Sequence, residues 1–152
     1  MEIQLIPVYT DRKLFLDMAR DYVDTLHEYD SSIRWDELTW QDSVWSAYFI
    51  MEDRTIQGFV VKEEIPYKVF PDMLYIMEFY VVPESRGRGV GTAAVEALVK
   101  DWHEDVFLYV LKDNFAAKAF WGAVEQKFGW ERTSRPEVRE EKGCELRVYH
   151  VN

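Results

Sequence analysis

The chain has 152 residues, of which 48% are hydrophobic and 16% aromatic, so it suits one domain with a sizeable core rather than a disordered chain. Its net charge of −10 argues against nucleic acid or an anionic membrane surface as the main partner. It has no run of about 18 apolar residues, no basic and apolar leader, and a single cysteine, Cys144, which excludes an internal disulfide and a multi-cysteine metal site. We therefore expect one cytoplasmic domain over residues 1–152 that binds no metal, nucleic acid or membrane.

The first half of the chain predicts a strand, two helices and a hairpin. The expected ranges are a strand at 2–8, a helix at 11–28, a short helix around 35–43, and hairpin strands at 47–52 and 55–64. Thr10 can cap the first helix. The apolar side chains of that helix recur at spacings of three and four: Phe15, Met18, Ala19, Tyr22 and Leu26. Gly58 in the second hairpin strand indicates a β-bulge or a close backbone approach.

The second half of the chain predicts six elements in the order strand, helix, strand, helix, strand and strand. The expected ranges are 73–82, 88–102, 106–111, 113 or 114 to 128, 130–133 and 144–151. The first of these strands is almost continuously apolar, which predicts burial on both faces. The helix at 88–102 is expected to bury Val90, Ala94, Ala97 and Leu98, and Gly129 to end the later helix. The crossover across 73–111 implies parallel strands, so we expect a mixed α/β sheet with helices on both faces.

The segment from Tyr75 to Trp102, YIMEFYVVPESRGRGVGTAAVEALVKDW, is the most informative part of the chain. It is an apolar strand, a loop rich in arginine and glycine, and an amphipathic helix. The first amides of a helix have no intrahelical partner, and the helix dipole favours negative charge there. Glycines let a ligand approach the backbone closely. The segment therefore predicts a site for a phosphate or pyrophosphate group.

Three phosphate-binding motifs are alternatives for this loop. A Walker A loop requires a lysine that is absent before Thr92. A dinucleotide-binding fingerprint is matched formally by GVGTAA, but six residues separate the strand from Gly89 and too few crossovers follow. The third alternative fits best, because RGRGVG resembles the [RQ]xxGx[GA] loop of the GNAT superfamily of acetyl-CoA-dependent N-acyltransferases.

The resemblance extends over nearly the whole chain. EFYVVPESRGRGVGTAAVEALV resembles the strand, loop and helix at the centre of that family, and AYFIMEDRTIQGFVV resembles the preceding strand pair. NFAAKAFW, followed by FGW, resembles the family's NxxAxxFY…GF helix. The resemblance implies a GNAT-like fold, a mostly antiparallel twisted sheet of about seven strands, and acetyl-CoA (coenzyme A) as co-substrate.

The resemblance also implies which residues contact the coenzyme. The amides of 87–92 would cradle the pyrophosphate, and the end of the long strand would pair with the pantetheine arm beside a splay between strands 73–82 and 106–111. An amide near Val81 would stabilise the oxyanion, and Asn114 would hydrogen-bond the pantetheine or act only as a helix cap. The full expected set is Phe79, Tyr80, Val81, Val82, Arg86, Gly87, Arg88, Gly89, Val90, Gly91, Thr92, Asn114, Ala117 and Phe120.

Glu78 is the candidate general base. It interrupts an apolar strand, and an unpaired buried carboxylate costs several kcal/mol. An alkylammonium with a pKa of about 10.4 must lose a proton before it attacks a thioester. The alternative is a salt bridge or an edge-exposed side chain. Trp121 departs from the family, which often has a proton-donating tyrosine there; Tyr80, Tyr109, Tyr149 or water would replace it.

The acceptor is expected to be a cationic primary amine of a small molecule or a peptide. Residues 26–45 would wall its site and combine carboxylates with tryptophans, which suits an ammonium group. The alternatives for these aromatics are the core or a contact between two copies, so a homodimer stays open. The alternative function is a non-catalytic module that binds or senses acyl-CoA, which the missing tyrosine permits.

Overall fold

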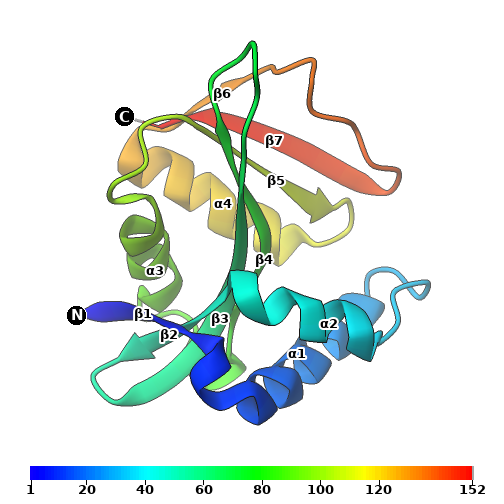
Figure 1. Ribbon diagram of the computed structural model, residues 1–152, viewed down its shortest axis with the longest axis vertical. Helices are drawn as coiled ribbons and strands as arrows, with labels where there is room; N and C mark the ends of the chain where they lie inside the picture. The colour runs from blue at the N-terminus through cyan, green and yellow to red at the C-terminus, as the bar shows by residue number, and fades with distance from the viewer. Residues whose placement is uncertain (152) are drawn as a thin grey trace. The chain divides into compact units, whose positions relative to one another are not determined.

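The computed structural model describes residues 1–151 and contains a seven-stranded sheet with four α-helices (Figure 1). The strand order is β1-β2-β3-β4-β5-β7-β6. The strands are β1 Ile3–Pro7, β2 Ala47–Glu52, β3 Thr55–Ile65, β4 Met73–Val81, β5 Asp105–Leu111, β6 Glu131–Thr133 and β7 Cys144–His150. The helices are α1 Arg12–His27, α2 Glu37–Ser43, α3 Val90–Val99 and α4 Phe115–Phe128. Both the predicted order of elements and the mixed, mostly antiparallel sheet are confirmed.

The chain divides into two compact units. The first comprises Met1–Lys62 and Glu78–Lys100, and the second comprises Glu63–Met77 and the chain from Asp101 onward. No helix of the described residues is long and apolar enough to cross a membrane.

A 3₁₀ turn that the sequence did not predict follows β1 in the first unit. It spans Val8–Asp11, and Val8 within it is fully buried. Asp11, and not Thr10, caps α1, since its carboxylate accepts from the Leu14 amide at 3.1 Å. The Thr10 hydroxyl instead donates to the Pro7 carbonyl at 2.8 Å.

The apolar face of α1 is confirmed with one change. Phe15, Met18 and Ala19 are buried as predicted, Val23 completes the face, and Tyr22 and Leu26 are half-buried. The short helix α2 lies beside α1 (Figure 1) and begins after Asp36, whose carboxylate caps it.

The hairpin of β2 and β3 contains the predicted irregularity at Gly58. Ile50 pairs with Gly58 and Met51 with Ile56, so Gln57 is the extra residue of a β-bulge. A Cβ on Gly58 would lie 1.9 Å from the Tyr80 carbonyl oxygen and 2.9 Å from the Val81 Cα. Gly58 is therefore the residue that allows β3 to approach the end of β4 so closely.

β4 and α3 differ from their predicted forms in three details. β4 is only half-buried at Glu78, Phe79 and Val81, so it is not buried on both faces along its length. α3 begins at Val90 instead of residue 88, because Gly89 adopts a left-handed φ of 82° that ends the loop. Val95 is buried, and Ala97, predicted to be buried, is half-buried.

The second unit contains the parallel pair and the last strands. β4 and β5 are parallel with Met73 opposite Asp105 and Tyr75 opposite Phe107, which confirms the predicted crossover connection. β7 pairs antiparallel with β5 and with β6. A core cluster gathers around Met73, Phe107, Val138 and Val148. Gly129 ends α4 at a left-handed φ of 67°, as predicted.

Candidate functional site

The loop between β4 and α3 has an open glycine backbone. Gly87 and Gly89 have φ of 80° and 82°, a conformation that L side chains rarely adopt. A Cβ on either residue would meet no atom within 4 Å, so the space beside the loop is open. Gly89 is the N-cap of α3 and, having no side chain, makes no side-chain hydrogen bond to the first amides of this helix. This open end of a helix fits a diphosphate, which binds amides and the positive end of the dipole.

Side chains behind the loop hold it in place. The Ser85 hydroxyl, which is buried, donates to the Gln57 side-chain oxygen, and the Gln57 amide donates to Glu52 at 3.3 Å. Glu52 also accepts from Arg88 at 3.1 Å. The bulged residue of β3 is therefore linked to the loop directly through Ser85 and indirectly through Glu52 and Arg88.

Arg86 turns back toward β4. Its Nε donates to the Val81 carbonyl at 2.8 Å, and its guanidinium lies 5.7 Å from the centre of the Tyr80 ring. Both arginines thus have partners within the first unit. Their predicted contacts with phosphate stay a prediction.

The end of β4 combines packing residues with backbone groups. Phe79 and Val81 pack against a cluster of Ile50, Val90 and Ala94, which joins the strand to α3. The Val82 amide donates to the Gln57 carbonyl at 2.8 Å. That amide is therefore engaged within the first unit, and the strand-like pairing of Phe79 to Val82 with a pantetheine arm stays a prediction.

Glu78 lies on β4 with a partner that sequence reasoning missed. The hydroxyl of Tyr22, on α1, donates a short hydrogen bond to Glu78 Oε2. The pair is half-buried and belongs wholly to the first unit. Fifty-six residues separate the two in the chain, and no local pattern links them. Glu78 is half-buried, and its predicted role as a base and the alternative of a salt bridge both stay predictions.

An aromatic cluster surrounds the Tyr22 ring. Its ring centre lies 5.5 Å from Phe59, 5.5 Å from Tyr80 and 6.0 Å from Trp40. Phe15 packs edge-on against Phe59 at 5.2 Å. Trp40 is only 8% exposed, so this tryptophan of the predicted acceptor wall belongs to the core.

The other tryptophans of that wall already face cations of this chain. The guanidinium of Arg20 lies 5.1 Å from the Trp35 ring centre, and that of Arg12 lies 4.9 Å from the Trp45 ring centre. Trp45 is 69% exposed. Recognition of a substrate ammonium would therefore depend more on carboxylates than on these two indole rings.

The remaining predicted residues lie in the second unit, on α4. The Asn114 side chain accepts from the Ala117 amide at 3.0 Å and caps the helix, as one of its two expected roles requires. Phe120 packs edge-on against Trp121, which is 6% exposed and is a core residue. The contacts of Asn114, Ala117 and Phe120 with coenzyme A stay predictions.

The tyrosines proposed to replace the missing proton donor are poorly suited to that role. Tyr149 is fully buried, and burial raises its pKa to about 12. The Tyr109 hydroxyl donates to the Arg139 carbonyl, and burial raises the pKa of this phenol too. Burial likewise raises the pKa of Tyr80, which leaves water as the simplest donor.

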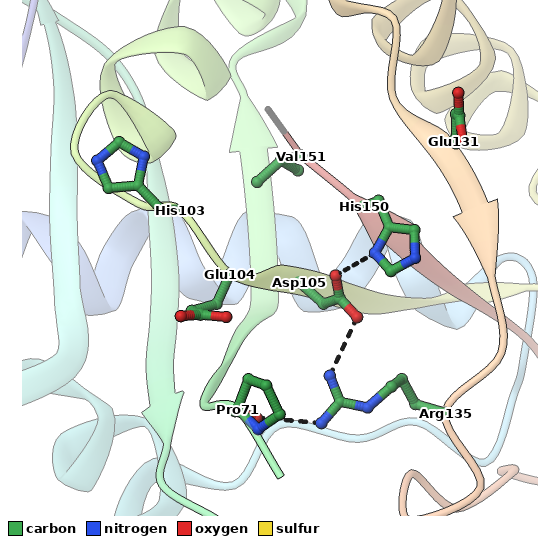
Figure 2. A pocket seen from close by; sticks show the side chains of 8 residues that line it. All are labelled: Pro71, His103, Glu104, Asp105, Glu131, Arg135, His150 and Val151. Carbon is green, nitrogen blue, oxygen red and sulfur yellow. Dashed lines mark hydrogen bonds and ion pairs between the residues drawn. The ribbon is translucent and has the colours of Figure 1, made fainter.

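A second polar cluster lies in the second unit, around a cavity of about 620 Å³ (Figure 2). Asp105 accepts from Arg135 at 3.0 Å on one oxygen and pairs with His150 on the other. Arg135 also donates to the Pro71 carbonyl at 3.1 Å and to Glu137. Burial acts to lower the pKa of Arg135, but these carboxylates outweigh it and raise that pKa. The cluster ties loops to β5.

Comparisons with known proteins support the predicted resemblance. A model of the acetyltransferase (GNAT) family matches residues 13–128. Diaminobutyrate acetyltransferase EctA from Paenibacillus lautus, solved with L-2,4-diaminobutyric acid and coenzyme A, is similar with a TM-score of 0.70 and 14% identity over 99% of this chain and 95% of its own. NAA60 from Arabidopsis thaliana, solved with a bisubstrate analogue, has a TM-score of 0.65 and 18% identity over 99% of both chains.

An aminoglycoside acetyltransferase from an uncultured soil metagenomic sample is similar over 92% of this chain and 90% of its own, with a TM-score of 0.60 and 16% identity. No curated protein sequence matches the chain. At these identities the solved structures show the fold, and the family match confirms the resemblance that the loop motif predicted.

Proposed function

Because the chain belongs to the acetyltransferase (GNAT) family of acetyl-CoA-dependent N-acetyltransferases, we propose that it moves an acetyl group from acetyl-CoA to a primary amine by direct attack in a ternary complex. The observation that carries the proposal is the position of Glu78. This carboxylate lies three residues before Val81, the last residue of β4, and the glycine loop follows after a 3₁₀ turn at Pro83–Ser85.

The loop and the strand would hold acetyl-CoA. The amides of 87–92, with the Thr92 hydroxyl, would bind the pyrophosphate, and Arg86 and Arg88 would add positive charge nearby. The backbone of Phe79 to Val81 would pair with the pantetheine arm as a strand does, and an amide near Val81 would bind the developing oxyanion. Asn114, Ala117 and Phe120 would contact the same arm. Acetyl-CoA supplies an activated acyl group with a thiolate as leaving group.

Glu78 would act as the general base. It accepts a proton from the substrate ammonium, directly or through water, and leaves a neutral amine. The amine nitrogen then bonds to the acetyl carbon while the carbon–sulfur bond breaks, and that nitrogen gives its second proton to water as the amide forms. A thiol pKa of about 8.5 makes the thiolate a tolerable leaving group, so water suffices to protonate it. No metal takes part in this scheme.

The acceptor would be a cationic amine of a small molecule or a peptide. The net charge of −10 favours an approaching cation, and the acidic residues Asp30, Asp36 and Glu37 lie on and before α2. Similar proteins include one solved with L-2,4-diaminobutyric acid and one named as an aminoglycoside acetyltransferase.

A contact between two copies of the chain would use another surface. Tyr9 and Trp45 are exposed, their rings lie 6.0 Å apart, and they would suit such a contact.

An acceptor panel with measurement of free thiol tests the proposal. Polyamines, aminoglycosides, diamino acids and peptides with a free amino terminus are compared with neutral and acidic amines. We expect amine-dependent thiol release with the cationic members. Glu78→Gln should lower kcat by about 10²- to 10⁴-fold with coenzyme A affinity retained. Glu96→Gln, an exposed carboxylate on α3, is the matched control and should be unchanged.

A non-catalytic acyl-CoA sensor is the second candidate. The observation that favours it is Trp121, which is buried where many relatives have a proton-donating tyrosine. Tight acetyl-CoA binding by calorimetry, with no thiol release across the whole panel, would support the sensor and refute the enzyme. Turnover confined to neutral or acidic amines would keep the enzyme and refute the cationic acceptor.

A further inference from the structure

A hydrogen bond between α1 and β4 involves Glu78, the proposed general base. Tyr22 Oη donates to Glu78 Oε2, and both side chains are half-buried. A hydrogen bond from a neutral donor to a carboxylate is stronger than one between two neutral groups. Leaving a partly buried carboxylate without such a donor carries a desolvation penalty. The bond therefore constrains where the Glu78 carboxylate lies.

The phenol is held by packing, so it can serve as a fixed reference for the carboxylate. Its ring meets Phe59 at an interplanar angle of 85° and Trp40 at 85°, both edge-on contacts. Tyr80 lies 5.5 Å away on β4 itself. Phe59 is fully buried and Trp40 is 8% exposed, so neither can move far. A tyrosine with two side-chain torsions, packed on three sides, holds its hydroxyl with little freedom.

Glu78 has three side-chain torsions, and the hydrogen bond from Tyr22 restricts the positions that its carboxylate can take. A carboxylate has about four lone-pair sites, so accepting from Tyr22 still permits it to accept a substrate proton. A base contributes fully only when it lies within hydrogen-bond reach of the proton that it removes. We propose that Tyr22 is a positioning residue, which holds the Glu78 carboxylate toward the acceptor nitrogen; the inference rests on the proposed function.

The same packing connects the base to α2. Trp40, the buried residue of α2, rests against the Tyr22 ring, so the helix expected to wall the acceptor also supports the phenol that orients the base. The acceptor wall and the base are thus held by one cluster.

The test is Tyr22→Phe, which keeps the ring and removes the hydroxyl. Tyr9→Phe, an exposed tyrosine, is the matched control. We expect Tyr22→Phe to fold and to lower kcat by about 10- to 100-fold, which is part of the rate factor that a general base supplies. The KM for acetyl-CoA should stay within about twofold of the parent value. A general packing defect would not lower kcat while leaving KM unchanged. The defect should shrink with a fluorinated alkylamine that is already neutral at pH 7, because such an acceptor needs no base.

A double-mutant cycle with Glu78→Gln completes the test. If Tyr22 acts through Glu78, Tyr22→Phe should change kcat little in the Glu78→Gln background. Full kcat in a folded Tyr22→Phe, an equal loss in both backgrounds, or an equal loss with the neutral amine would each overturn the inference and leave the proposed function standing. Turnover with no amine would overturn both. The same cycle measured on the free energy of unfolding in urea reports whether Tyr22 and Glu78 interact, independently of activity.

Discussion

Gly58→Ala is the substitution with the most specific structural consequence. The added Cβ would lie 1.9 Å from the Tyr80 carbonyl oxygen, whereas real Cβ atoms essentially never come within 3.0 Å of another heavy atom. β3 and the end of β4 would therefore have to part by about 1.1 Å, and backbone atoms offer no rotamer that relieves the clash. Overpacking typically costs about 1–3 kcal/mol, and we take the upper value of about 3 kcal/mol because the clash is with backbone atoms. In a chain of this size that loss lowers Tm by about 6–12 °C.

The assay is urea unfolding at equilibrium, followed by far-ultraviolet circular dichroism. Gly122→Ala is the matched control, since Gly122 lies within α4 and its Cβ would come no closer than 3.8 Å to the Glu125 carboxylate. Alanine in a helix interior is favoured by about 1 kcal/mol, so this control should be stabilised. A Gly58→Ala protein within about 0.5 kcal/mol of the parent, a change typical of ordinary surface sites, would refute the reasoning. We also expect weaker coenzyme A binding, because the displaced residues follow Glu78.

Two further predictions concern the loop and the carboxylates. Gly89→Glu should abolish coenzyme A binding measured by calorimetry, because it places a negative charge at the N-terminus of α3. Gly143→Glu is the control and should retain binding, since Gly143 has the same φ of 82° and a Cβ there would also meet no atom within 4 Å. Unchanged affinity in a folded Gly89→Glu protein would contradict the proposed role of the loop. Burial acts to raise the pKa of Glu125, but hydrogen bonds from Arg132 outweigh it and hold that pKa below 4.5. A lowered pKa stabilises the fold above the unfolded value and loses that effect as pH falls through the folded value. The unfolding free energy should therefore drop as the pH falls below about 4.5, and less so in Glu125→Gln. An identical slope in both proteins would rule out this contribution.

The sequence was sufficient where the signal is local. Hydrophobic periodicity predicted the elements in order, and Gly58, Asn114 and Gly129 predicted a bulge, a cap and a helix end. It chose wrongly between Thr10 and Asp11, because both side chains can cap a helix and the 3₁₀ turn at Val8–Asp11 places the start of α1 one residue later than predicted. The predicted start of α3 was also too early. Hydrophobic periodicity does not show that Gly89 adopts a left-handed conformation, which excludes it from the helix.

The candidate site was predictable as a loop and not as a set of contacts. A motif located the glycines and the strand before them, and an acid in an apolar strand located Glu78. The link from Tyr22 to Glu78 depends on how α1 packs, and at the sequence level Tyr22 is one member of an apolar helix face. The ion pair of Arg88 with Glu52 likewise joins residues far apart in the chain. The sequence therefore identified Arg88 as a positive charge near the loop but did not identify its carboxylate partner.

That ion pair has a consequence for how ionic strength affects the cofactor. Arg88 is paired with Glu52 at 3.1 Å and Arg86 donates to the Val81 carbonyl, so under the proposed function much of the attraction for a diphosphate would come from the neutral amides at the N-terminus of α3. The chain as a whole carries −10 and repels an anion at long range. Salt at about 0.1 M screens charges beyond about 10 Å but leaves close contacts with amides nearly intact. Affinity for coenzyme A should then hold or rise as salt is added, the reverse of a site that grips phosphate through solvent-exposed arginines.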